Sequence, residues 1–145
     1  MIILDTNVVS EPLKPRPAQA VVDWLDRQAP QTLYITTINL AELLAGIEAL
    51  PPGRRRTELH QAFVQQVMPL FNGRILTFDA PAAESFAKIN TQAQAAGNPI
   101  SFADAAIAAI ASANGFMVAT RHVKDFKGTG VAIVDPWGLS KPIAS

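Results

Sequence analysis

Short runs of β-branched and apolar residues alternate along this chain with longer segments of helical apolar spacing, and this alternation constrains the fold more than any other feature. The short runs occupy residues 2–4, 33–37, 75–78, 117–120 and 131–134. The helical patterns cover about residues 18–28, 39–50, 53–71, 80–96 and 101–115. The short runs are typical of strands buried on both faces, and parallel strands need crossover helices. We therefore predict an α/β fold of three layers, α/β/α, with a central parallel sheet of about five strands.

Composition limits the classes of protein that remain. With 145 residues, of which 49% are hydrophobic, residues 1–145 are expected to form one domain. Twelve Lys and Arg balance twelve Asp and Glu, so any contact with nucleic acid must come from a local basic patch. Cysteine is absent and histidine occurs only twice, which excludes disulfide scaffolds and zinc sites that need cysteine. No run approaches the ~20 apolar residues of a membrane span, and we expect a cytoplasmic protein.

Polar residues follow the first and fourth predicted strands, at the edge where ligands bind in open parallel sheets. Asp5 comes directly after the first strand, in the sequence LDTN. Thr120, Arg121 and Asp125 follow the fourth, in ATRHVKDF. The stretch from Asp5 to Asn7 is also compatible with a simple turn, because Asp, Thr and Asn side chains bond their own backbone.

Glu42 lies on a predicted helix above the small residues Ala45, Gly46 and Ala49, a face that permits close approach. Leu40 and other leucines form a separate apolar stripe. Taken alone, Glu42 is more typical of a solvated position on the helix surface, and only the other acids favour a role in a site.

Asp104 is the one carboxylate in a run that is otherwise apolar from Phe102 to Ala111, and we expect this helix to be buried on every side. Ser101, three residues earlier, resembles a helix cap, which would explain an acid in the first turn. Capping and a ligand role are compatible. Burying an unaccompanied carboxylate is costly, so Asp104 needs a companion.

Asp5, Glu42 and Asp104 are thus acids on a strand end and two helices, without an adjacent lysine or arginine. Their mutual repulsion favours a cation between them. Carboxylates without thiols or histidines are the ligand set of hard divalent ions. We predict that the companion is Mg²⁺, or alternatively Mn²⁺.

At this point the chain resembles the PIN-domain ribonucleases, in particular the VapC-type toxins of toxin–antitoxin pairs and their FitB-like branch. The resemblance is carried by MIILDTNVVSE, TTINLAELLAGI, ISFADAAIAAIA and MVATRHVKDFKG, in that order. It implies a metal-dependent endoribonuclease toxin in which Asp5, Glu42 and Asp104 are catalytic acids that bind Mg²⁺. It also implies that Thr6 or Asn7, together with Thr120, orient water, ligands or phosphate, and that the partners are RNA, a second copy of the chain and a VapB/FitA-like antitoxin.

One position departs from the family pattern. Members of the family have an Asp or Asn directly after the Thr-Arg pair, an Asp in the following DF, or both, and in this chain the first of these positions is His122. Asp125 is then the remaining candidate for a fourth catalytic acid, although a loop acid between Lys124 and Lys127 is also compatible with a solvated position. We therefore expect one metal ion rather than two.

The candidates for substrate binding are the basic residues that follow the fourth strand, Arg121, Lys124 and Lys127, which could hold the phosphates of single-stranded RNA. The triple arginine at 54–56 is a weaker candidate. Two rival functions remain. A phosphatase with Asp5 as nucleophile expects an acid where Asn7 stands, whereas a catalytically silent PIN-like module that binds RNA or a partner is left open by His122.

Overall fold

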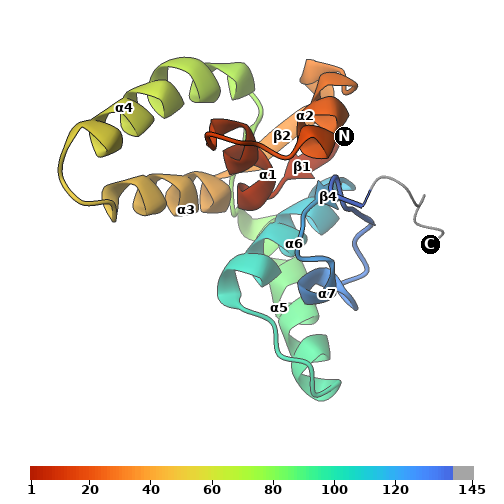
Figure 1. Cartoon of the computed structure of the whole chain (residues 1–145). Coiled ribbons are helices and arrows are strands. Elements are labelled where there is room, and N and C mark those ends of the chain that lie inside the picture. The colour runs from red at the N-terminus through yellow and green to blue at the C-terminus, as the bar shows by residue number, and fades with distance from the viewer. Residues whose placement is uncertain (139–145) are drawn as a thin grey trace.

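The computed structural model describes residues 1–138, and its centre is a five-stranded parallel sheet with strand order β3-β2-β1-β4-β5 (Figure 1). Ile3 in the central strand pairs with Tyr34 on one side and Val118 on the other. The strands are β1 (Ile2–Leu4), β2 (Leu33–Thr36), β3 (Ile75–Leu76), β4 (Met117–Ala119) and β5 (Ile133–Val134). The predicted parallel sheet is confirmed. Residues 139–145, which the domain prediction included, lie outside the described residues.

Helices connect successive strands. The α-helices are α1 (Thr6–Ser10), α2 (Gln19–Asp26), α3 (Thr37–Glu48), α4 (Arg54–Ala62), α5 (Ala80–Ala95), α6 (Phe102–Asn114) and α7 (Val123–Phe126). The shorter helical segments are η1 (Glu11–Leu13), η2 (Pro30–Thr32), η3 (Phe63–Val67) and η4 (Met68–Phe71). Within residues 1–138, every helix is too short or too polar to span a membrane.

Alternating side chains of the strands divide the core into two halves, one on each face of the sheet. Ile3 and Val118 pack with α5 and α6 in one half. Leu4 and Ala119, the next residues along the same strands, pack with α1 to α3 and with η3 and η4 in the other. Figure 1 shows α5 and α6 side by side, with α3 and α4 extending away from them. The predicted α/β/α layering is confirmed.

The predicted helix over residues 53–71 is not one regular α-helix. It begins as α4, widens into a π-helical segment at η3, and ends as a 3₁₀ helix at η4. Pro69 explains the change, because proline has no N–H to donate and its ring opposes a continuing α-helix. The wider turn places Phe63 fully inside the core.

The expectation that α6 is buried on every side is wrong for its first turn. The helix is fully buried from Ala105 to Ala111, but Phe102 is 60% exposed. Asp104 is only half-buried. Gly115 ends the helix in the left-handed conformation, at φ 71°, which glycine adopts without a Cβ clash. The first turn of α6 therefore lies at the surface, where a ligand can reach Asp104.

Candidate active site

Asp5 stands at the end of β1, the central strand, and is 4% exposed. Its backbone N–H donates to the carbonyl of Ala119 at the end of β4, 2.9 Å away, which holds the two strand ends together. The residues after Asp5 form α1 rather than the simple turn that was also compatible with the sequence, and the Asp5 carboxylate caps this helix by accepting from the Thr6 N–H at 2.8 Å. Strand pairing and helix capping together fix the direction of the carboxylate.

Three side chains also donate to this carboxylate. The Thr120 hydroxyl donates to Oδ2 at 2.7 Å, and the amides of Asn7 and Asn39 donate at 3.3 Å to Oδ2 and Oδ1 respectively. The two shorter bonds, from Thr120 and the Thr6 N–H, have ordinary lengths, whereas both amide contacts are long. The amide contacts are therefore the ones that can give way when Asp5 binds something else.

Asn39 was not among the predicted site residues, yet it links two elements of the site. It is fully buried in the first turn of α3. Its Oδ1 accepts from the N–H and the hydroxyl of Thr36 at 2.9 and 2.7 Å, while its amide N donates to Asp5 and to the Thr6 hydroxyl. The signal in the sequence was the spacing of Thr36 and Asn39 after the second strand, which is typical of a reciprocal helix cap.

Glu42 lies one turn further along α3 and is exposed. Its Oε1 accepts from the Thr6 hydroxyl at 2.7 Å, so the residue after Asp5 bridges the two acids. Ala45 and Gly46 are also exposed, and Gly46 lines the same cavity as Glu42. The open face leaves room beside Glu42 for a ligand.

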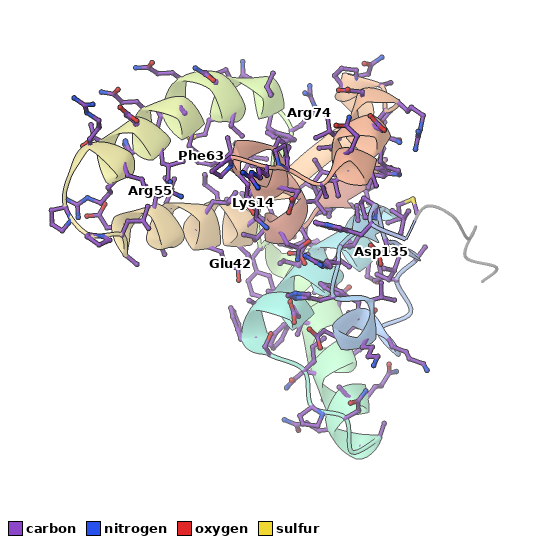
Figure 2. The ribbon with its side chains drawn as sticks, in the orientation of Figure 1. Lys14, Glu42, Arg55, Phe63, Arg74 and Asp135 are labelled. Atoms are coloured by element: carbon purple, nitrogen blue, oxygen red, sulfur yellow. The ribbon has the colours of Figure 1, made fainter. Side chains whose placement is uncertain are left out.

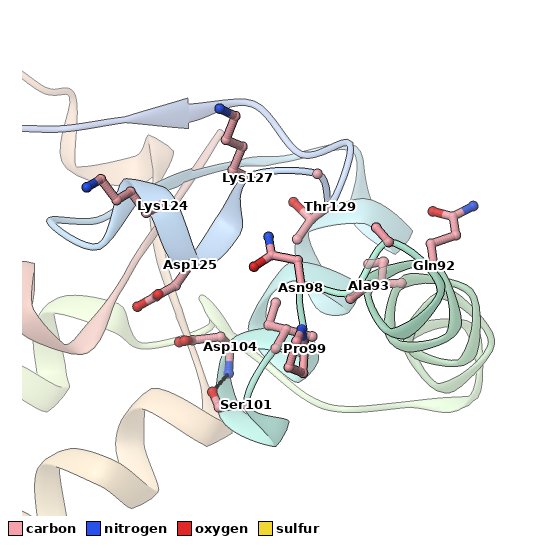
Figure 3. A pocket seen from close by; sticks show the side chains of 14 residues that line it. Gln92, Ala93, Asn98, Pro99, Ser101, Asp104, Lys124, Asp125, Lys127 and Thr129 are labelled. Carbon is pink, nitrogen blue, oxygen red and sulfur yellow. Dashed lines mark hydrogen bonds between the residues drawn. The ribbon is translucent and has the colours of Figure 1, made fainter.

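Asp104 enters the site from the first turn of α6, where its N–H donates to the Ser101 hydroxyl at 3.2 Å (Figure 3). The predicted cap is therefore present. Partial burial raises the pKa of Asp104, the Ser101 contact lowers it, and the charges of three further acids raise it, namely those of Asp5, Asp125 and Glu42. The structure thus brings the other three predicted acids close enough to Asp104 for their charges to affect it, although the four come from separate elements.

Asp125 lies on α7 and shares a cavity with Asp104, with both carboxylates at the same end of it (Figure 3). His122, the residue that departs from the family pattern, lies with Nδ1 3.7 Å from Oδ2 of Asp125, and both side chains are exposed. The contact is an ion pair only when the histidine is protonated. His122 is therefore next to the acidic group rather than remote from it.

The basic candidates divide into two groups. Lys124 and Lys127 line the cavity that contains Asp104. Arg121 donates its backbone N–H to Oδ1 of Asn7 at 3.1 Å, while its guanidinium carbon lies 5.1 Å from the ring centre of Trp137. The Arg121 side chain thus lies against an aromatic face, and the two lysines share a cavity with Asp104 and Asp125.

The triple arginine lies at the start of α4. Arg54 and Arg56 make long, exposed contacts with Glu58 and Glu48, at 3.9 and 4.0 Å. Arg55 instead lines a cavity of about 320 Å³ that also contains Glu42 and Thr6. Figure 2 shows Glu42 and Arg55 on the neighbouring helices α3 and α4. Of the three arginines, Arg55 is the one near the site.

The chemistry of these side chains fits a hard divalent cation, but the side chains do not form a complete coordination site. Every acid is an oxygen donor, and partial burial together with the charges of the other acids raises the pKa of Asp104. Within residues 1–138, however, no three acidic or histidine side chains are arranged to hold a metal ion. The predicted three-ligand set of Asp5, Glu42 and Asp104 is therefore not preformed. Mg²⁺ usually keeps several waters and binds one or two carboxylates, which suits an open group of this kind.

A family model described as "PIN domain" matches residues 2–129, which contain every acid of the site. The chain belongs to the PIN-domain family.

Two relatives place it beside the VapC and FitB toxins. "VapC ribonuclease Y4jK" of Sinorhizobium fredii is 46% identical over 94% of this chain and 98% of its own. "Toxin FitB" of Neisseria gonorrhoeae is 44% identical over 94% of this chain and 99% of its own. The resemblance inferred from the motifs is confirmed.

Solved structures agree with this assignment. A chain of "Crystal Structure of FitAcB from Neisseria gonorrhoeae" matches with a TM-score of 0.92 and 43% identity, over 95% of this PIN domain and 99% of that chain. A chain of "Crystal structure of DNA bound VapBC from Salmonella typhimurium" shares the fold with a TM-score of 0.73 at 24% identity, over 93% and 97% of the two chains. The PIN fold is thus common to near and distant relatives.

Proposed function

We propose that this PIN-domain protein is a divalent-metal-dependent endoribonuclease, the toxin of a toxin–antitoxin pair of the VapBC and FitAB kind. The observation that carries the proposal is the convergence of Asp5, Glu42 and Asp125 on Asp104, whose pKa is raised by partial burial and by the charges of these three acids. The similarity to a VapC ribonuclease and to Toxin FitB over nearly the whole chain supports it.

In this proposal Asp5 and Asp104 hold Mg²⁺ or Mn²⁺, with Glu42 acting directly or through water. A bound ion of this kind lowers the pKa of a coordinated water and offsets the charge that builds on the phosphate. Thr120 and the Thr6 N–H keep Asp5 pointing into the site through their short hydrogen bonds. The Thr6 hydroxyl does the same for Glu42.

The remaining side chains have supporting roles. Asp125 adds a fourth negative charge and we assign it as a further catalytic acid. Lys124, at the cavity beside Asp104, binds a phosphate of the RNA strand. Asn7 orients the segment after β4 through its contact with the Arg121 N–H. Arg121, stacked on Trp137, is positioned to meet a phosphate at the edge of the site.

The partners follow from the same similarity. We infer a VapB/FitA-like antitoxin, because a structure that matches with a TM-score of 0.92 at 43% identity is described as FitAcB and another as DNA-bound VapBC. We also infer a homodimer that acts within the cytoplasm. A cationic side chain of an antitoxin placed among the acids would offset the charges that otherwise attract the metal ion.

Cleavage of a mixed pool of single-stranded RNA by the purified, antitoxin-free protein tests the function. The reactions contain Mg²⁺, Mn²⁺ or a chelator, with Asp104→Asn in parallel. Asp26→Asn is the matched control, because Asp26 is an exposed acid on α2, outside the site. We expect cleavage that needs metal, persists in Asp26→Asn and disappears in Asp104→Asn. Cleavage by Asp104→Asn would refute the site assignment, and folded protein that never cleaves would favour the silent binding module.

A further inference from the structure

A cavity of about 250 Å³ opens beside Asp104, between the C-terminal part of α5, the segment that leads into α6, and α7 (Figure 3). Asp104 and Asp125 occupy one end of it. Ile89 and Ala93 of α5 and Pro99 of the connecting segment supply apolar surface. The cavity therefore continues from the acidic group as a pocket with both polar and apolar walls.

The polar side chains of this pocket differ in which of their hydrogen-bonding groups are free to contact a ligand. The Thr129 hydroxyl donates to the carbonyl of Phe126 at 2.7 Å and accepts from the Val131 N–H, so it closes the turn after α7. Gln92 points away from the other lining residues in Figure 3. The Asn98 amide lies within the pocket near Asp125 and Thr129, and no hydrogen bond joins it to another lining residue drawn there. Asn98 thus presents a donor and an acceptor to the cavity.

The pocket contains both acidic and basic residues. In Figure 3 the two carboxylates and Lys124 lie toward one end, and the Asn98 amide lies further along, near Thr129. Lys124 and Lys127, on and after α7, line the same cavity with exposed side chains. A phosphate cannot approach the carboxylates without a cation, but it can contact the lysines. The apolar wall can contact the face of a nucleobase, and the amide can form hydrogen bonds with its edge. Bases in single-stranded RNA are recognised by such hydrogen bonds to their edges.

We propose that this pocket binds the nucleotide next to the scissile phosphate of a single-stranded RNA, with the Asn98 amide hydrogen-bonded to the base edge. The proposal rests on the ribonuclease function proposed above. Lys127 holds the phosphate on the far side of that nucleotide, and the apolar residues of α5 receive the base. Asn98 is then a specificity-determining residue, and Lys127 contributes affinity without selecting a base.

The test compares wild-type protein with Asn98→Ala and Lys127→Ala, mapping cut sites in a randomised single-stranded RNA pool by sequencing the product ends. Gln94→Ala is the matched control, because Gln94 is an exposed amide on α5 that does not line the cavity. We expect Asn98→Ala to lower the base preference at one position next to the cut by about three- to tenfold, the usual effect of a lost hydrogen bond. Lys127→Ala is expected to raise KM for all sequences alike and to weaken the salt dependence.

The outcomes separate this inference from the function on which it rests. An unchanged base preference in Asn98→Ala, in a protein that cleaves, overturns the pocket assignment alone. If the wild type does not cleave, the pocket is tested by the binding of a labelled single-stranded oligoribonucleotide to the Asp104→Asn protein. Loss of this binding when Asn98→Ala is added to the same protein would still support the pocket. Unchanged RNA binding, or a defect confined to antitoxin binding, overturns it.

Discussion

Replacing Asn39 by alanine is expected to destabilise the protein more than any exposed substitution in the site. Asn39 and Thr36 are both fully buried. Without the Asn39 Oδ1, the N–H and the hydroxyl of Thr36 lose their acceptor, and Asp5 and Thr6 lose a donor. The substitution therefore removes the Asn39 half of the capping box of α3 and the link between α3 and the end of β1 in one step, while the Thr36 hydroxyl can still accept from the N–H of residue 39.

The magnitude follows from the number of buried groups left without a partner. Two unpaired buried donors at about 1–2 kcal/mol each lower the free energy of unfolding by about 3 kcal/mol. For a chain of this length that lowers Tm by about 6–12 °C. With a urea m-value of about 2 kcal/mol/M, the midpoint falls by about 1.5 M.

Urea and thermal unfolding followed by circular dichroism measure this change. Asn114→Ala is the control, because Asn114 is exposed and makes one hydrogen bond, to the carbonyl of Ile110. It should cost less than about 1 kcal/mol. Asn39→Asp keeps the shape but places a second carboxylate beside Asp5, so its stability should recover as the pH falls. A loss below about 1 kcal/mol in Asn39→Ala would refute the argument from buried hydrogen bonds.

Three further predictions concern the neighbouring groups. Thr120→Val removes the shortest hydrogen bond to the Asp5 carboxylate and leaves the His122 N–H without its acceptor. The rate of RNA cleavage should fall, and the free energy of unfolding, measured by thermal melting, should drop by about 1–2 kcal/mol. The pKa of Asp104 is raised in the folded protein above its ordinary value of 3.8, so the folded state keeps a proton on this carboxyl that the unfolded state releases. The metal-free wild type should therefore lose stability relative to Asp104→Asn as the pH rises above 3.8. The same dependence of Tm on pH in both proteins would contradict this. The Ala18 N–H, and after it Lys14, lower the pKa of the Glu11 carboxyl from its ordinary value of 4.5. The ionised carboxylate therefore stabilises the folded protein above pH 4.5, and this stabilisation is lost as the pH falls below that value. Glu11→Gln should remove that part of the dependence of Tm on acid pH.

Much of the fold could be predicted because its signals are local. The alternation of strands and helices determined the parallel sheet, and the apolar run after Ala105 correctly indicated a buried helix. The prediction that Phe102 is buried was wrong, because the burial of a helix's first turn depends on which element covers it. The composition of the helix does not contain that information. Its ring instead contacts Phe86 and Phe78 at the surface edge of the core.

The nearness of Asp5, Asp104 and Asp125 could be predicted because each follows a strand or lies in the first turn of a helix, whereas Glu42 lies in the middle of α3. Asn39 could not be found in the same way, since two of its four side-chain hydrogen bonds reach residues more than thirty positions away, Asp5 and Thr6. The pairing of His122 with Asp125, and the position of Asn98 beside Asp104, likewise depend on how α7 and the segment before α6 come together. Such contacts are set by tertiary packing rather than by local sequence.

Binding of a divalent ion to the acids tests the central claim most directly. Titration calorimetry of Mn²⁺ into antitoxin-free wild type, Asp104→Asn and Asp26→Asn separates the site from other surface acids. Because even supporting residues of metal sites change affinity by about 10- to 100-fold, loss of a ligand should weaken binding at least that much. We predict saturable binding in wild type and Asp26→Asn that is lost in Asp104→Asn. Equal binding by all three proteins would contradict a metal centre at these acids.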